Sequence, residues 1–73
     1  MDDPVLSEVN REVVLAFAEC NMKIRETARK IFRHRNTVVY HLIQIKAITG
    51  LDPYNFYDLV KLVKMAKGET DNV

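Results

Sequence analysis

The sequence predicts an all-α fold, a small four-helix domain that contains a helix-turn-helix. Apolar residues recur at steps of three and four along most of the chain, and no segment alternates as a strand would. At 73 residues, of which 48% are hydrophobic, the chain fits one folded domain rather than a disordered segment. We therefore expect a single domain over residues 1–73, with an ordered core at about residues 7–67 and frayed residues 1–6 and 68–73.

The first helix is expected at about residues 7–20. Its apolar residues fall at helical spacing: Leu6, Val9, Val13, Val14, Phe17 and Ala18. Ser7 and Asn10 can each cap the helix, because both side chains can accept a hydrogen bond from a backbone N–H further along. The sequence therefore allows two starts for this helix, about one turn apart.

The second helix is expected at about residues 25–32. Ile24, Ala28 and Ile31 should point inward, and Arg29 outward. Ala28 is informative because two helices that cross within a tight corner need a small side chain at the crossing. The second helix therefore forms the first half of a helix-turn-helix.

The third helix begins between His34 and Asn36 and continues to Thr49. Its core stripe repeats at steps of four and three: Val38, Leu42, Ile45 and Ile48. Gly50 should end the helix, because glycine adopts the left-handed conformation of a C-cap without steric cost.

The fourth helix starts at Asp52-Pro53 or at Asn55 and extends to about Lys67. One apolar stripe should face the core: Phe56, Leu59, Val60, Val63 and Ala66. Leu62 and Met65 widen the apolar surface beyond that stripe. We therefore expect part of this helix to meet another chain.

Charge is distributed unevenly along the chain. Residues 21–46 hold seven of the eleven lysine and arginine residues and one acid, Glu26, whereas both flanks are acidic. The formal net charge of +1 conceals this basic third. Because clustered cations bind polyanions, we expect a nucleic-acid partner.

The polar face of the third helix carries side chains that can read DNA. Opposite the apolar stripe, we predict base contacts by Arg35, Asn36, Thr37, Tyr40, His41 and Gln44. We predict phosphate contacts by Arg29, Lys30, Arg33 and His34. A solvated face without a partner has a similar composition, but the spacing from Ala28 to Leu42 favours a helix-turn-helix on double-stranded DNA. The recognition helix is then about residues 35–49.

The residue inventory argues against catalysis, cofactors and metals. Ser7 is the only serine, and Gly50 and Gly68 are the only glycines, so a glycine loop for phosphate cannot form. His34 and His41 lack the further ligands that a zinc site needs. We expect neither an enzyme nor a small-molecule site in this domain.

Cysteine usage and hydropathy bear on location. Cys20 is the single cysteine, so an intramolecular disulfide is excluded and a reducing compartment is favoured. The longest apolar run, residues 13–18, is too short to cross a bilayer, and a signal peptide is not visible. We expect a soluble, cytoplasmic protein that does not contact a membrane.

The helix-turn-helix residues carry a resemblance to a known family. The relevant segments are Thr27-Ala28, Ile31, His34-Arg35-Asn36-Thr37-Val38, Tyr40, Leu42, Ile45 and Thr49-Gly50-Leu51-Asp52. Together they resemble the C-terminal helix-turn-helix of PucR/CdaR-type transcriptional regulators over about residues 14–66, and more distantly the DNA-binding end of Fis. The resemblance implies sequence-specific DNA binding as a homodimer, and transcription controlled by an N-terminal sensor region. It also implies that residues 34–37 start the recognition helix and that Tyr40 and His41 face DNA.

Four positions depart from the family pattern. His41 stands where arginine is common, which can make binding sensitive to pH. Arg33 stands where an apolar residue anchors the turn, so the corner is rearranged or this arginine reaches outward to a phosphate. Arg25 replaces a small polar cap before the second helix. Lys23 stands at a usual asparagine.

Two other functions fit parts of the sequence. A helical protein-interaction module would use the apolar surface around Leu62 and Met65 without touching DNA. Binding of structured RNA is disfavoured, because several exposed aromatic residues do not fall together as a stacking platform.

Overall fold

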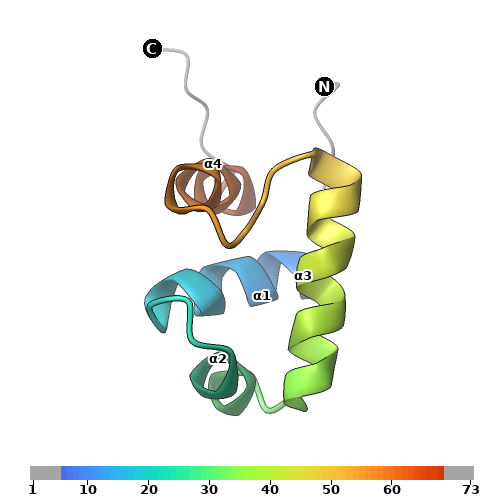
Figure 1. The fold of residues 1–73 in the computed structure, drawn as a ribbon, viewed down its shortest axis with the longest axis vertical. Coiled ribbons are helices and arrows are strands. Elements are labelled where there is room, and N and C mark those ends of the chain that lie inside the picture. Colours follow the sequence, from blue (N-terminus) through green and yellow to red (C-terminus); the bar gives the residue numbers. More distant parts are fainter. Residues whose placement is uncertain (1–5, 69–73) are drawn as a thin grey trace.

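The computed structural model describes residues 6–68, which form four helices joined by short turns (Figure 1). The helices are α1 (Glu8–Glu19), α2 (Ile24–Lys30), α3 (Arg35–Thr49) and α4 (Phe56–Ala66). Residues 6–68 contain no strand. The predicted all-α, four-helix fold with a helix-turn-helix is therefore confirmed.

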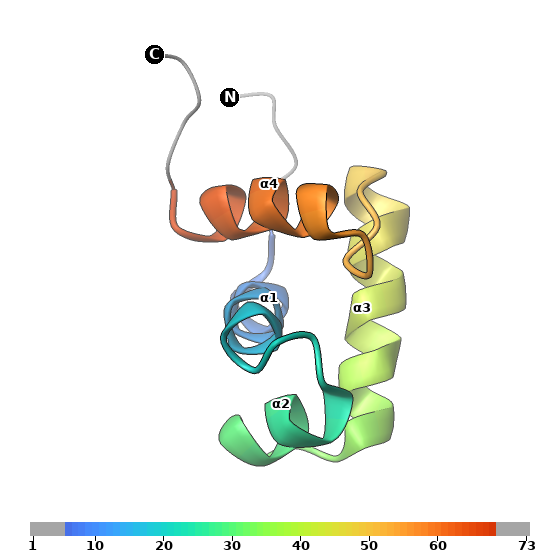
Figure 2. The ribbon, with the colours of Figure 1, turned by 60° about the vertical axis from the view of Figure 1, so that its left-hand side comes forward.

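Helix α1 is the central support of the fold. It lies between α2 and α4, and α3 runs along one side of this stack (Figure 2). Helix α1 contacts all three other helices, and α2 also packs against α3. In the described part of the chain, α4 contacts α1 but neither α2 nor α3. The α2–α3 pair and α4 therefore rest on different sides of α1.

The core forms where α1 meets the other helices. Val13, Val14 and Phe17 of α1 are fully buried. Phe17 also meets Tyr54 edge to face, with 5.6 Å between the ring centroids, a geometry in which the positive edge of one ring approaches the negative face of the other. The other buried apolar side chains of this cluster are Leu6, Ala28, Val38, Leu42, Ile45, Leu59, Leu62 and Ala66.

Polar caps and a glycine set several helix ends. Ser7 Oγ accepts a hydrogen bond from the backbone N–H of Asn10 at 3.1 Å, so Ser7 is the N-cap of α1. Asn55 Oδ1 accepts one from the backbone three residues on, at the start of α4. Gly50 follows α3 with a left-handed φ of 77°. Ser7, Asn55 and Gly50 thus act as predicted, whereas Asn10 lies inside α1 and is not its cap.

Helix α2 is shorter than predicted and begins earlier. Its N-cap is Lys23, whose side chain makes no capping hydrogen bond, so the cap position lies before Arg25. The helix ends at Lys30, and Ile31 is its C-cap. Phe32, predicted as helical, is left-handed with a φ of 57° and is 93% exposed. The sharp corner into α3 therefore takes up the predicted last turn of α2.

The buried face of α4 also differs from the predicted one. Leu62 is fully buried, whereas Phe56 and Val60 are 62% and 39% exposed. Helix α4 crosses α1 with Leu59, Leu62 and Ala66 inward, and this rotates the buried face away from Phe56 and Val60. The prediction that Leu62 forms part of an outer surface is wrong.

Two smaller corrections concern the ends of the core. Ile48 of α3 is 47% exposed, because α4 does not cover that part of α3. Leu6, predicted within a frayed segment, is buried against the core. The rest of the predicted frayed ends, residues 1–5 and 69–73, lies outside the described residues. None of the helices in residues 6–68 is long and apolar enough to span a membrane.

Candidate nucleic-acid interface

The corner between α2 and α3 is four residues long, 31–34. The backbone N–H of Arg33 donates to the carbonyl oxygen of Ala28 at 2.9 Å, and that of Phe32 donates to Arg29 at 3.3 Å. This pair of bonds is the Schellman arrangement, in which a left-handed residue just after the helix lets the chain turn back on the last turn. The corner directs α3 away from α2 at a fixed angle.

The start of α3 is fixed by His34, its N-cap. The Nδ1 atom of His34 accepts a hydrogen bond from the backbone N–H of Asn36 at 3.0 Å. The carbonyl oxygen of His34 accepts from Thr37 and Val38. These bonds define the conformation of the first turn of α3, which is where the sequence predicts base contacts.

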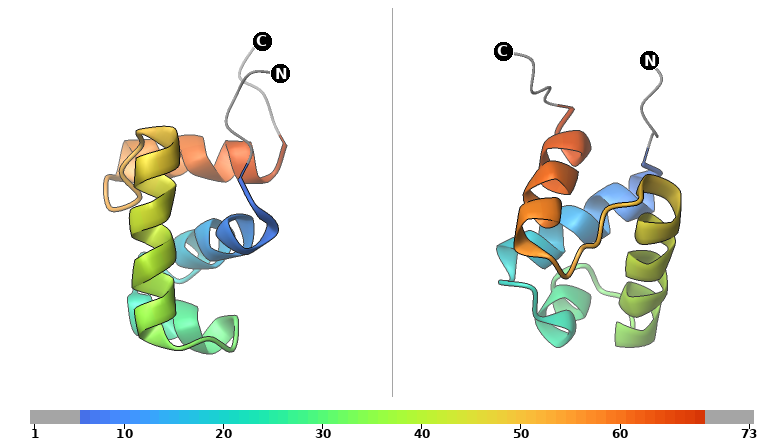
Figure 3. Two further views of the ribbon diagram at one scale, coloured as in Figure 1. Left: turned by 90° about the vertical axis from the view of Figure 1, so that its right-hand side faces the viewer. Right: turned by 45° about the horizontal axis from the view of Figure 1, so that its top comes forward.

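One face of α3 is open to solvent. Figure 3 (left) looks onto this helix, which crosses in front of the other three. Arg35 and Asn36 are exposed, Tyr40 is 59% exposed and Thr37 is half-buried. Four of the predicted base-contacting residues therefore lie along one outward-facing part of the helix.

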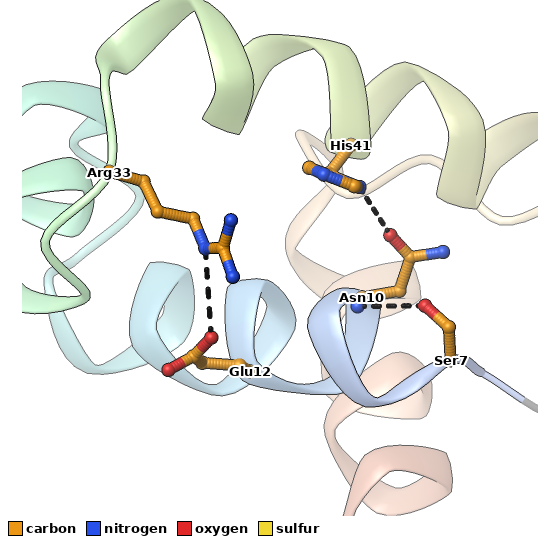
Figure 4. A network of polar contacts seen from close by, with 5 residues as sticks. All are labelled: Ser7, Asn10, Glu12, Arg33 and His41. Atoms are coloured by element: carbon orange, nitrogen blue, oxygen red, sulfur yellow. Dashed lines mark hydrogen bonds and ion pairs between the residues drawn. The ribbon is translucent and has the colours of Figure 1, made fainter.

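The other two predicted base-contacting residues, His41 and Gln44, are half-buried and turn toward α1. The Nδ1 atom of His41 lies 2.9 Å from Oδ1 of Asn10, and Nδ2 of Asn10 donates to Oε1 of Gln44 at 3.3 Å. Figure 4 shows Asn10 reaching from α1 to His41, with the Ser7 cap beside it. His41 and Gln44 thus lie at the edge of the outward face, each with one polar atom occupied.

Asn10 was not predicted as part of this site. It is 1% exposed, and it occupies an apolar position of α1, four residues after Leu6 and three before Val13. A polar residue inside an apolar stripe needs a hydrogen-bonding partner when buried. The sequence shows that a polar residue stands at this apolar position, but it does not show which residue bonds it.

Cations gather around the corner. Arg29 and Arg35 are exposed and take part in no ion pair with any described residue. Lys30 Nζ lies 3.5 Å from Oε1 of Glu19 on α1, with about half of each side chain exposed. Exposed ion pairs contribute about 0–1 kcal/mol, so the amine of Lys30 can exchange this partner for a phosphate.

The side chain of Arg33 points toward α1 rather than freely outward. Its Nε atom lies 3.9 Å from Oε1 of Glu12 on α1 (Figure 4). The side chains are 38% and 50% exposed, so water screens this contact. The four residues predicted to contact phosphate thus lie in the last turn of α2 and in the corner.

A second surface feature lies away from this site. A groove of about 410 Å³ runs between the end of α1 and α4, lined mainly by apolar side chains: Ala18, Met22, Phe56, Leu59, Val60 and Val63. Within residues 6–68, no three His, Cys, Asp or Glu side chains gather as a metal site would require.

The comparisons with known proteins agree with this arrangement. A family model described as the PucR C-terminal helix-turn-helix domain matches residues 11–64, which include the corner and all of α3. Searches of curated proteins and of solved structures gave no significant match. The helix-turn-helix geometry and the extent of the family match lead to one conclusion. The chain belongs to the family of PucR C-terminal helix-turn-helix domains, a DNA-binding kind of domain in transcription regulators.

Proposed function

We propose that this domain binds double-stranded DNA in a sequence-specific manner, with α3 in the major groove, and so regulates transcription. The observation that carries the proposal is the open, polar start of α3, where Arg35, Asn36 and Tyr40 are exposed. An α-helix fits the major groove, where arginine can bond guanine and asparagine can bond adenine through two hydrogen bonds each. Thr37 is suited to a phosphate or a thymine methyl group.

Phosphate contacts would come from the cations around the corner. Arg29 makes no ion pair within residues 6–68, and Lys30 and Arg33 can leave their weak partners on α1. His34 lies at the same corner. Each phosphate neutralised by a cation releases counterions, so the logarithm of the binding constant falls by about 0.9 per phosphate for each tenfold rise in salt.

A homodimer is the second part of the proposal. One small module makes few base contacts, so useful specificity requires two copies on half-sites about 34 Å apart. The exposed apolar side chains of α4, Phe56, Tyr57 and Val60, provide a surface on which a second copy can pack. Helix α4 rests on the opposite side of α1 from α2.

The DNA proposal is tested by titrating the ¹⁵N-labelled protein with a random-sequence duplex. Shift changes should concentrate between residues 29 and 44 and should fall steeply as salt rises. Changes confined to α1 and α4 would contradict the proposed face. A chain that ignores duplex DNA and heparin at low salt, yet self-associates or captures a protein, would instead be an interaction module.

The dimer is tested by measuring molar mass in light scattering, with and without a duplex that carries two half-sites. Val60→Asp places a charge on the apolar surface and should prevent the second copy from joining the complex. Lys61→Asp is the control, because it changes the charge of the neighbouring exposed residue without touching that apolar surface. Equal dimerisation of both variants would rule out this face of α4.

A further inference from the structure

Asn10 links α1 to the recognition helix through a partly buried polar network. Its side chain is 1% exposed and lies between His41 and Gln44 of α3. Asn10 precedes the segment that the family model matches, residues 11–64. The network therefore joins a residue just before the matched segment to two residues of the recognition helix.

The direction of each hydrogen bond follows from the chemistry of the amide. Oδ1 of Asn10 can only accept, so the Nδ1 atom of His41, 2.9 Å away, must carry the proton. Nδ2 of Asn10 can only donate, and it donates to Oε1 of Gln44. Asn10 thus fixes both the tautomer of His41 and the orientation of the Gln44 amide.

The atoms left over on these two side chains are available to a partner. Among the described residues, every buried side-chain nitrogen or oxygen atom has a hydrogen-bond partner. Nε2 of His41 and Nε2 of Gln44 have none within those residues, so solvent reaches both atoms. In the neutral imidazole, Nε2 of His41 is an acceptor, whereas the amide nitrogen of Gln44 is a donor.

We propose that Asn10 is a positioning residue for base recognition: it makes His41 present an acceptor and Gln44 present a donor to the major groove. This inference rests on the proposed DNA function. An acceptor suits the amino groups of cytosine or adenine, and a donor suits guanine O6 or N7, thymine O4 or adenine N7. Gln44, whose oxygen is bonded to Asn10, reads bases as a donor rather than through the bidentate adenine pair.

The tautomer can be measured without DNA. Two-bond ¹H–¹⁵N correlation of the ring nitrogens, at about pH 8 where an ordinary imidazole is neutral, should show His41 protonated at Nδ1 and unprotonated at Nε2. The opposite tautomer would mean that the Asn10 amide is reversed, and it would overturn the proposal. This measurement uses the unmodified protein, so it holds whether or not any variant folds.

Asn10→Asp should invert both outward groups. A carboxylate accepts but does not donate, so the Gln44 amide must turn its nitrogen inward and its oxygen outward. The carboxylate also favours the protonated imidazole, which makes Nε2 of His41 a donor. In selection from randomised duplexes, the preferred base opposite each of these side chains should change about fivefold or more in relative affinity.

Ser7→Ala is the matched control. It removes the cap that bonds the backbone of Asn10, but it leaves the amide network intact, so base preference should not change. If Asn10→Asp also leaves the base preference unchanged, the role of Asn10 is overturned but the DNA function is not. The same holds if the protein binds DNA and His41 carries its proton on Nε2. A correct tautomer in a protein that binds no duplex at low salt would overturn the DNA function and, with it, this role.

Discussion

The Nε atom of Arg33, in the corner between α2 and α3, lies 3.9 Å from Oε1 of Glu12 on α1. The contact joins the helix-turn-helix to its supporting helix across the surface. At this distance and with both side chains more than a third exposed, it adds little to stability. In the proposed complex with DNA, the carboxylate would compete with phosphates for the guanidinium group.

Glu12→Gln should therefore strengthen binding to any duplex. Removing the carboxylate frees Arg33 and removes a repulsion toward the phosphates, and we expect a gain of about threefold at low salt that vanishes as salt rises. Fluorescence anisotropy with a random duplex measures it. Glu8→Gln removes the same charge one turn earlier on α1, from a side chain that makes no ion pair with Arg33, and should change affinity less. Equal gains for both variants would show that net charge alone is responsible.

Base contacts and phosphate contacts should respond differently to alanine substitution. Asn36→Ala and Thr37→Ala should reduce the ratio of cognate to random affinity, by about 1–3 kcal/mol for a base contact. Lys30→Ala should weaken binding to all sequences about equally and lower the salt slope by about one. The three variants are compared on a selected operator and on random DNA. Equal losses on both duplexes for all three would contradict base reading by α3.

The sequence was sufficient for the fold where one side of a helix is apolar and its ends carry strong signals. Helix α3 shows this: Val38, Leu42 and Ile45 repeat at helical spacing, and Gly50 stops the helix. Helix α4 also has a polar side, formed by Asp58, Lys61 and Lys64, but its apolar side is broader than the part that it buries. Only its crossing on α1 decides that Leu62 is buried, and a pattern within one helix does not contain that information.

The candidate site was predictable to a similar degree. Residues adjacent in sequence, such as Arg35 and Asn36, reach the surface together because one turn of helix places them there. Contacts between distant residues were not predictable: Asn10 meets His41 across 31 positions, and Glu12 meets Arg33. Such partners depend on how α1 packs against α3 and the corner, which local spacing does not determine.

Lys23→Asn should stabilise the domain. Lys23 is the N-cap of α2 but offers no acceptor, whereas an asparagine side chain can bond a backbone N–H of the first turn. We expect a gain of about 1 kcal/mol in the free energy of unfolding, or about 4–8 °C in melting temperature. Arg25→Asn is the control, because Arg25 lies inside the helix and should give no gain. A larger gain in stability for Arg25→Asn than for Lys23→Asn would place the cap at Arg25.

Phe32→Gly should also stabilise the domain. Phe32 has a φ of 57°, where a side chain costs about 1–2 kcal/mol, and at 93% exposure its ring gains little from packing. Part of the relief is offset by the greater freedom of glycine in the unfolded chain, so a net gain of about 0.5–1 kcal/mol is expected in urea unfolding. Phe32→Ala keeps the strain and should be close to neutral. A loss on Phe32→Gly would show that the ring makes a contact important for folding.

Leu62→Ala and Phe56→Ala compare the observed face of α4 with the predicted one. Leu62 is fully buried on the side of α4 that packs against α1, so its truncation should leave a cavity and cost about 2–5 kcal/mol in the free energy of unfolding. Phe56 is 62% exposed, and its truncation should cost less than about 1 kcal/mol. Chemical denaturation of the two variants measures the difference. A larger loss for Phe56→Ala would mean that α4 is rotated on α1, with Phe56 in the core and Leu62 on the surface.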